Sequence, residues 1–140
     1  MHSGGFADIP DTRAYIDVLA KEYDGGKFRT LAIAERHSDI LLGCITIDKH
    51  KYFPCAELGY WIAAPHRNKG YMTEAVSAVI KYGFSNLELI RIQAYHSVNN
   101  PASGRVLEKA GMMCEGILRL YNGRSDEKMY AVINTDKLPD

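Results

Sequence analysis

Short stretches in which apolar and polar residues alternate recur along the chain and predict β-strands. The expected strands are Arg29–Glu35, Leu41–Ile47, Ala56–Ile62, Leu89–Tyr95, Met113–Tyr121 and Lys128–Ile133. A polar turn around His37–Asp39 joins the first two, and Asn122-Gly123 is a turn signal between the last two. Each of these two pairs is therefore expected to form a hairpin.

A helical spacing of apolar residues follows the third of these strands. Beyond Gly70, apolar residues recur every three or four positions and would share one buried helix face: Met72, Val76, Val79, Ile80 and Phe84. A helix between two strands forms a crossover connection. The strands Ala56–Ile62 and Leu89–Tyr95 should therefore lie parallel to each other.

Two more helices are expected from their end signals. Asp11 can cap a helix over Thr12–Tyr23. Either Asn99 or Asn100 can cap a short helix that has Pro101 at its first position.

Together these elements predict an α/β fold, which some schemes class as α+β. Its sheet would be mixed and mostly antiparallel, with one parallel pair in the middle and a hairpin at the end. The 140 residues fit a single domain, 1–140, with enough length for a sizeable core.

Charge is balanced over the whole chain, because 17 basic and 17 acidic residues give a formal net charge of zero. This balance argues against a general affinity for nucleic acid or for an anionic membrane. No apolar run is long enough to span a bilayer, and the first residues lack the hydrophobic stretch of a secretion signal. We therefore expect a cytoplasmic protein.

The cysteines and histidines show no pattern of metal ligands. Cys44, Cys55 and Cys114 have no CxxC spacing, and the five histidines have no ligand spacing either. We expect no metal, and we expect the cysteines to be small buried apolar residues in a reducing compartment.

A short basic loop, Arg67-Asn68-Lys69-Gly70, stands where the helix after Ala56–Ile62 begins. A helix start leaves main-chain N–H groups unpaired and carries a partial positive charge, so such a loop can hold a phosphate. The spacing matches neither GxGxxG nor GxxxxGK[ST], and similar residues occur at ordinary surface turns. From these residues alone, a site for a phosphorylated cofactor and a simple surface turn both remain open.

Three blocks of sequence extend this pattern in order: AELGYWIAAPHRNKGYMTEAV, NNPASGRVLEKAGM and EGILRLYNGRSDEKMYAV. They resemble the GNAT superfamily of N-acetyltransferases, and most of all the branch typified by RimJ and RimL, which acetylate ribosomal-protein N-termini. The resemblance covers about Arg29 to the C-terminus. It implies that acetyl-CoA is the cosubstrate and that a primary amine, on a protein N-terminus or a small molecule, attacks it directly in a ternary complex.

The family's pattern at the basic loop, Gln/Arg-x-x-Gly-x-Gly/Ala, is matched by residues 67–72. By this resemblance the diphosphate of coenzyme A would be held by the loop and the first turn of the helix: Arg67, Asn68, Lys69, Gly70, Tyr71, Met72 and Thr73. Met72 replaces the usual small residue, so we expect its side chain to turn toward the core.

In this family the two central parallel strands splay apart, and the pantetheine arm enters the gap like an added strand. The resemblance therefore assigns main-chain groups of Tyr60, Trp61 and Ile62 to the arm. One of those N–H groups can also stabilise the oxyanion. Asn100 would hold the arm through its amide, or merely cap the short helix.

Related enzymes often place a carboxylate base on the central strand, where this chain has Glu57. Strand alternation puts Glu57 on one face with Gly59 and Trp61. Glu57 is therefore a candidate base, acting directly or through water. The alternative is a solvated or ion-paired strand glutamate.

Ser103 matches the serine of the family's Asn-x-Ala-Ser block. It is the candidate donor of a hydrogen bond to the departing thiolate. Many members use a tyrosine four residues before the glycine of the next block, but this chain has Leu107 there. The alternative for Ser103 is a helix-capping role.

Family members usually carry a strand and a helix ahead of the helix expected over Thr12–Tyr23, and both are expected to be missing here. An exposed sheet edge would follow, and such edges invite pairing with another chain. We therefore expect either a homodimer or a shortened protein with impaired acceptor binding. The competing function is a non-catalytic acyl-CoA-binding or regulatory module with a degenerate acceptor site.

Overall fold

The computed structural model describes residues 28–140, and the structural statements below refer to this part of the chain. The helix expected over Thr12–Tyr23 and the sequence ahead of it lie outside the described residues. Within residues 28–140, every helix is too short or too polar to cross a membrane.

The described elements follow the predicted order. They are β1 (Phe28–Ala34), β2 (Leu41–Lys49), β3 (Cys55–Ile62), α2 (Tyr71–Asn86), β4 (Arg91–Ser97), α3 (Pro101–Lys109), β5 (Met113–Leu118) and β6 (Glu127–Ile133). A short 3₁₀ helix, η1 (Ala64–His66), lies between β3 and α2. Each predicted strand and helix in this range is present, with its ends displaced by a few residues.

The strands form one mixed sheet in the order β1-β2-β3-β4-β6-β5. All neighbouring pairs are antiparallel except β3 and β4, which are parallel. The α/β class and the mostly antiparallel sheet with one central parallel pair are therefore confirmed.

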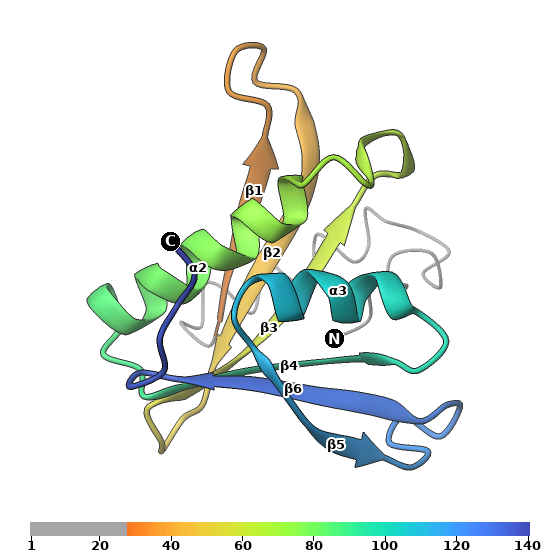
Figure 1. Cartoon of the computed structure of the whole chain (residues 1–140). Coiled ribbons are helices and arrows are strands. Elements are labelled where there is room, and N and C mark those ends of the chain that lie inside the picture. The colour runs from red at the N-terminus through yellow and green to blue at the C-terminus, as the bar shows by residue number, and fades with distance from the viewer. Residues whose placement is uncertain (1–27) are drawn as a thin grey trace.

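The parallel pair comes apart along its length. β3 and β4 pair only where Cys55–Glu57 meets Arg91–Gln93, although β3 continues to Ile62 and β4 to Ser97. Beyond this short ladder the two strands diverge and split the sheet into a β1–β2–β3 half and a β4–β6–β5 half (Figure 1). This is the splayed pair that the resemblance implied.

The core lies between the sheet and the helices α2 and α3, which cover the same face of the sheet (Figure 1). Along β3, Ala56, Leu58 and Tyr60 are buried in this core, whereas the alternate residues are only half-buried. The predicted face of α2 is buried from Met72 to Ile80, and Phe84 packs partly against it. Glu57, Gly59 and Trp61 therefore face the opposite side of the sheet.

The C-terminal hairpin has a longer connection than expected. β5 ends at Leu118 rather than Tyr121, and Leu120 has a φ of 45°, which does not continue a strand. Residues 119–126 form a loop in which Asn122 Oδ1 accepts hydrogen bonds from the main-chain N–H groups of Arg124 and Ser125, both at 2.9 Å. Asn122-Gly123 thus lies in a turn, but the turn is part of this longer loop.

The expectation that all three cysteines are buried is wrong. Cys114 is exposed on the edge strand β5, and Cys44 and Cys55 are half-buried. Strand alternation explains why Cys44 and Cys55 are only half-buried. Cys55 lies on the face of β3 away from the helices, and Cys44 pairs with Trp61, which lies on that same face.

Candidate active site

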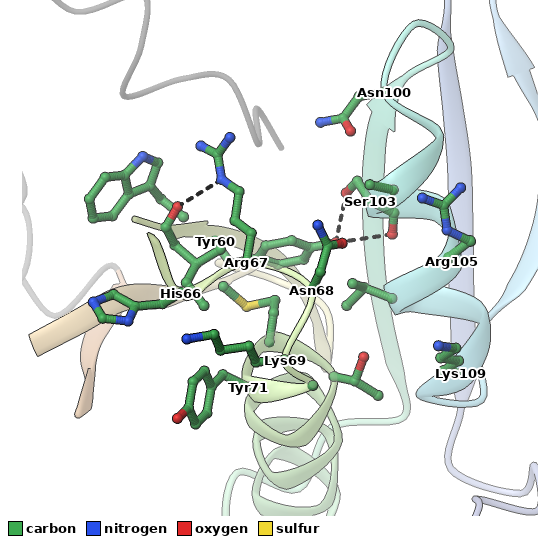
Figure 2. A pocket seen from close by; sticks show the side chains of 17 residues that line it. Tyr60, His66, Arg67, Asn68, Lys69, Tyr71, Asn100, Ser103, Arg105 and Lys109 are labelled. Atoms are coloured by element: carbon green, nitrogen blue, oxygen red, sulfur yellow. Dashed lines mark hydrogen bonds between the residues drawn. The ribbon is translucent and has the colours of Figure 1, made fainter. Parts of the chain in front are cut away.

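A cavity of about 510 Å³ opens where β3 and β4 diverge. It is lined by the end of β3, the following loop, the first turn of α2 and one side of α3 (Figure 2). The lining includes every predicted cofactor-binding residue, namely Tyr60, Trp61, Ile62, residues 67–73 and Asn100, together with Ser103. The structure thus brings all of them to one place, but Glu57 is not in this lining.

The start of α2 presents main-chain N–H groups to the cavity. Gly70 is the N-cap with a left-handed φ of 83°, and Asn68 has a φ of 61°. The first helical hydrogen bond runs from the N–H of Glu74 to the carbonyl of Gly70 at 3.1 Å, and no side chain among residues 28–140 caps this helix end. The N–H groups of residues 71–73 therefore precede the first helical bond, which suits an anion.

Basic side chains surround this helix start. His66, Arg67 and Lys69 lie on one side of the cavity, and Arg105 and Lys109 approach from α3 (Figure 2). Among the described residues that line the cavity, none is acidic. Positive charge and a helix N-terminus at one place suit a phosphorylated ligand.

Arg105 and Lys109 also line the cavity, although no sequence motif predicted them. Their spacing of four residues places both on one face of a helix, but only the packing of α3 across the gap turns that face toward the cavity. A search for basic residues at helical spacing after Asn100 would have found them.

Arg67 has a structural role as well. Its Nε donates a hydrogen bond to the main-chain carbonyl of Ile62 at 3.2 Å, which ties the basic loop to the end of β3. Met72 turns inward as predicted, since only 6% of its surface is exposed. The loop therefore stays close to the strand end that borders the gap.

Ser103 is buried at the edge of the cavity, with 4% of its surface exposed. Its Oγ lies 2.7 Å from the hydroxyl of Tyr60, which also reaches the main-chain oxygen of Ser103 at 3.3 Å. Burial raises the pKa of the Tyr60 hydroxyl well above its ordinary value. Asn100 occupies the N-cap position of α3 without a capping hydrogen bond from its side chain, and Leu107 is fully buried in the core.

Glu57 lies on the other face of the sheet from Ser103. It is half-buried, and its Oε2 accepts a hydrogen bond from Gln93 Nε2 at 3.0 Å. Tyr95 lies near it, and its pKa is raised to about 12 by burial and by the negative charges of Glu57 and Glu127. The structure thus places the two predicted catalytic residues on opposite sides of the splayed strands.

Glu127 is a buried carboxylate that no sequence motif predicted. It is fully buried at the start of β6, and its Oε1 accepts a hydrogen bond from Asn122 Nδ2 at 2.9 Å. Its Oε2 has no hydrogen-bond partner within residues 28–140. No local sequence pattern distinguishes this glutamate, because its burial depends on the loop 119–126 and on β4.

No cluster of three potential metal ligands occurs within the described range 28–140. The expectation of a metal-free protein stays a prediction.

Comparison with known proteins agrees with this geometry. A family model described as an acetyltransferase (GNAT) domain matches residues 3–113. The uncharacterized N-acetyltransferase YoaA of Bacillus subtilis is 38% identical over 133 residues, which cover 89% of this chain and 73% of YoaA. The ribosomal-protein-serine acetyltransferase of Escherichia coli is 31% identical over 100 residues, covering 68% of this chain and 56% of that protein.

Among solved structures, Mycobacterium smegmatis RimJ in complex with CoA-disulfide aligns with a TM-score of 0.77 at 26% identity, covering 87% of this chain and 60% of that chain. These relatives support a place in the RimJ/RimL-like branch. Since the family model covers most of the sequence and the fold agrees with it, the chain belongs to the GNAT family of acetyltransferases.

Proposed function

We propose that this protein transfers the acetyl group of acetyl-CoA to a primary amine in a ternary complex. The amine belongs to a protein N-terminus or to a small molecule. One observation carries the proposal: a single cavity at the fork of β3 and β4 collects a free helix N-terminus, basic side chains and the buried Ser103 hydroxyl.

The cavity suits coenzyme A in two parts. The diphosphate would meet the N–H groups at the start of α2 and the basic residues around them. The pantetheine arm would run along the end of β3, at Tyr60, Trp61 and Ile62, which lie beyond the short ladder that joins β3 to β4. The CoA-disulfide bound to the RimJ relative supports this choice of cosubstrate.

The two sides of the fork would serve the two halves of the reaction. The amine would approach from the face that carries Glu57, which would take its proton directly or through water. A main-chain N–H of β3 would stabilise the oxyanion, and Ser103 on the other face would donate a hydrogen bond to the thiolate. An α-amino group, with a pKa of about 7.7–8.0, needs less help from a base than a lysine-like amine at about 10.4.

The main alternative is an acyl-CoA-binding module without catalysis. The two are separated by incubating the protein with acetyl-CoA and a panel of N-terminal peptides and small amines, while free thiol and acetylated product are both measured. We expect equal amounts of thiol and product for at least one amine. Calorimetric binding of acetyl-CoA without any product would support the module, and neither binding nor product would refute both functions.

The choice of candidate acceptor amines is guided by what the named relatives acetylate. The Escherichia coli relative is a ribosomal-protein-serine acetyltransferase, so peptides that begin with serine should be included in the panel. Transfer confined to polyamines would favour the small-molecule acceptor instead.

We also propose a cytoplasmic homodimer. Among the strands of residues 28–140, β1 lies at an edge of the sheet, and such an edge can pair with a second chain. Cys44, Cys55 and Cys114 form no disulfide, as is usual in a reducing compartment. Light scattering should give the mass of two chains, and a stable monomer would contradict the dimer; cell fractionation tests the location.

A further inference from the structure

The side chain of Tyr60 crosses from β3 to α3 and ends against Ser103 (Figure 2). Both residues are nearly inaccessible, with 7% and 4% of their surfaces exposed. The oxygen–oxygen distance of 2.7 Å is typical of a well-formed O–H···O hydrogen bond. The functions assigned so far use only the main chain of Tyr60, so its hydroxyl is unexplained.

Each of the two hydroxyls has one proton, and two arrangements are compatible with the distances. In the first, Tyr60 donates to Ser103 Oγ, and the Ser103 proton is left to point into the cavity. In the second, Ser103 donates to Tyr60, and Tyr60 donates to the main-chain oxygen of Ser103 at 3.3 Å. Only the first arrangement gives Ser103 a proton to offer a ligand.

We propose that Tyr60 is a positioning residue for the leaving group: its hydroxyl donates to Ser103 Oγ and thereby directs the Ser103 proton toward the sulfur of coenzyme A. This proposal rests on the acetyl transfer proposed above. The 2.7 Å contact with Ser103 Oγ occurs in both arrangements. In the second, however, the Tyr60 proton has only the longer 3.3 Å contact with the main-chain oxygen. A ligand that accepts the Ser103 proton therefore favours the first arrangement, in which Tyr60 donates over the shorter distance.

The environment keeps Tyr60 a hydrogen-bond donor rather than a proton source. Burial raises the pKa of its hydroxyl, so the phenol stays protonated through the reaction. The hydrogen bond from Tyr60 also fixes the orientation of the Ser103 hydroxyl against a competing local interaction. A serine in the first turn of a helix can bond to nearby main-chain groups, which would turn its hydroxyl away from the cavity.

The step balances without any proton leaving the Tyr60–Ser103 pair. The amine nitrogen forms a bond to the carbonyl carbon, the C–S bond breaks, and its electron pair stays on sulfur. The Ser103 O–H donates a hydrogen bond to this thiolate, and the Tyr60 O–H strengthens that donor by polarising it. The amine proton passes to the base or to water, and the thiolate takes a proton from solvent after it leaves.

The test is Tyr60→Phe, which removes one oxygen and keeps the ring in the core. We expect kcat to fall about two- to tenfold, the range of one hydrogen bond. The KM for acetyl-CoA and the calorimetric affinity for coenzyme A should stay within about twofold. In the second arrangement the same change would free the Ser103 proton, so an unchanged or higher kcat would overturn the proposal.

A double-mutant cycle with Ser103→Ala shows whether the two hydroxyls act together. Without Ser103, the change Tyr60→Phe should have almost no further effect on kcat. A full additional loss in the Ser103→Ala background would show that Tyr60 acts independently, which contradicts the proposal.

Tyr130→Phe is the matched control. Tyr130 is also buried, with 2% exposed, but its hydroxyl donates to Glu108 Oε1 at 3.0 Å. Its kcat should stay within about 1.5-fold of the wild type, because this bond does not involve Ser103. A loss in kcat equal to that of Tyr60→Phe would point to general disturbance of the core and refute the specific role.

If Tyr60→Phe does not fold at the assay temperature, 4-aminophenylalanine at position 60 keeps a weaker donor in place. Its kcat should be lower than that of the wild type at unchanged affinity for coenzyme A, and a wild-type kcat would contradict the proposal. A wild-type protein that binds acetyl-CoA but transfers no acetyl group to any amine would instead refute the proposed function itself.

Discussion

The two helices that border the cavity begin in different ways. α2 starts at Gly70, whose left-handed backbone and missing side chain leave the main-chain N–H groups of the first turn open to the cavity. α3 starts at Asn100 and Pro101, and proline has no N–H to offer. What α3 presents instead is side chains, namely Ser103, Arg105 and Lys109.

We infer from this difference that the start of α2 serves mainly to bind coenzyme A and that Ser103 on α3 serves the chemical step. A main-chain site is insensitive to most side-chain changes but depends on backbone conformation, so α2 suits a constant group such as a diphosphate. A side-chain site can be altered one group at a time, so α3 suits the leaving-group contact. Variants at α2 should therefore change affinity for coenzyme A, and variants at Ser103 should change turnover.

The largest effect is expected at the start of α2. In Gly70→Trp the new Cβ would meet no atom of residues 28–140 within 4 Å, and the φ of 83° adds strain. Because Gly70 lines the cavity, we expect the indole to occupy part of the space proposed for the diphosphate. We expect the affinity for coenzyme A, measured by calorimetry, to fall about 100-fold, roughly 2.7 kcal/mol.

Gly123→Trp is the control for this change. Gly123 also has a positive φ, of 76°, and within the described part of the chain no atom lies within 4 Å of an added Cβ. It lies in the loop 119–126, outside the cavity lining. Its affinity for coenzyme A should stay within twofold of the wild type. Unchanged affinity in Gly70→Trp would remove the start of α2 from the binding site.

A smaller effect, on turnover and not on affinity for coenzyme A, is expected at Ser103. Ser103→Ala should lower kcat about tenfold, the range of one hydrogen bond to a charged group, and leave the affinity for coenzyme A within twofold. Ser38→Ala, in the exposed turn between β1 and β2, should leave both unchanged. Equal losses of kcat and affinity in Ser103→Ala would mean that Ser103 only stabilises the start of α3.

Arg105→Gln tests whether α3 also contributes to binding through charge. We expect affinity for coenzyme A to fall about three- to fivefold at low salt and less at high salt, because an exposed charge acts through screened electrostatics. Arg119→Gln, an exposed basic residue outside the cavity lining, is the control. A loss that is the same for both variants would indicate only an effect of net charge.

The smallest effect is expected on the stability of the fold, at the ion pair between Arg91 and Glu115, which lies outside the cavity lining. Arg91 holds Glu115 with two hydrogen bonds of 2.7 and 3.1 Å between β4 and β5, and this contact lowers the pKa of Glu115 below its ordinary 4.5. The pair therefore stabilises the fold fully above about pH 4.5, and the contribution is lost as the pH falls through the lowered pKa.

Glu115→Gln should cost less than about 1 kcal/mol of unfolding free energy at pH 7, since both side chains are partly exposed. Urea unfolding at pH 7 and at pH 3 measures this, and the difference from the wild type should shrink at the lower pH. A difference that grows toward acid would contradict the assignment. Affinity for coenzyme A should not change.

The contrast between the two helix starts also explains what could be predicted from sequence. The residues around Gly70 and the block Asn100–Ser103 are contiguous, so their motifs and the strand–helix–strand order revealed both the fold and most of the cavity lining. The splay followed from the family resemblance, and the short ladder between β3 and β4 confirms it.

Long-range packing accounts for what was missed. The contact between Tyr60 and Ser103 joins residues 43 positions apart, and no local pattern reports it. The burial of Glu127 and the exposure of Cys114 likewise depend on which strand lies at the edge of the sheet. Strand alternation shows which residues share a face but not which neighbours cover that face.

A crystal structure of the protein with bound coenzyme A tests the central claim most directly. It should place the diphosphate against the main-chain N–H groups of residues 68–73 and the pantetheine arm along Tyr60–Ile62, between the diverging ends of β3 and β4. A diphosphate bound anywhere else on the protein, or an arm that runs outside this gap, would contradict the account.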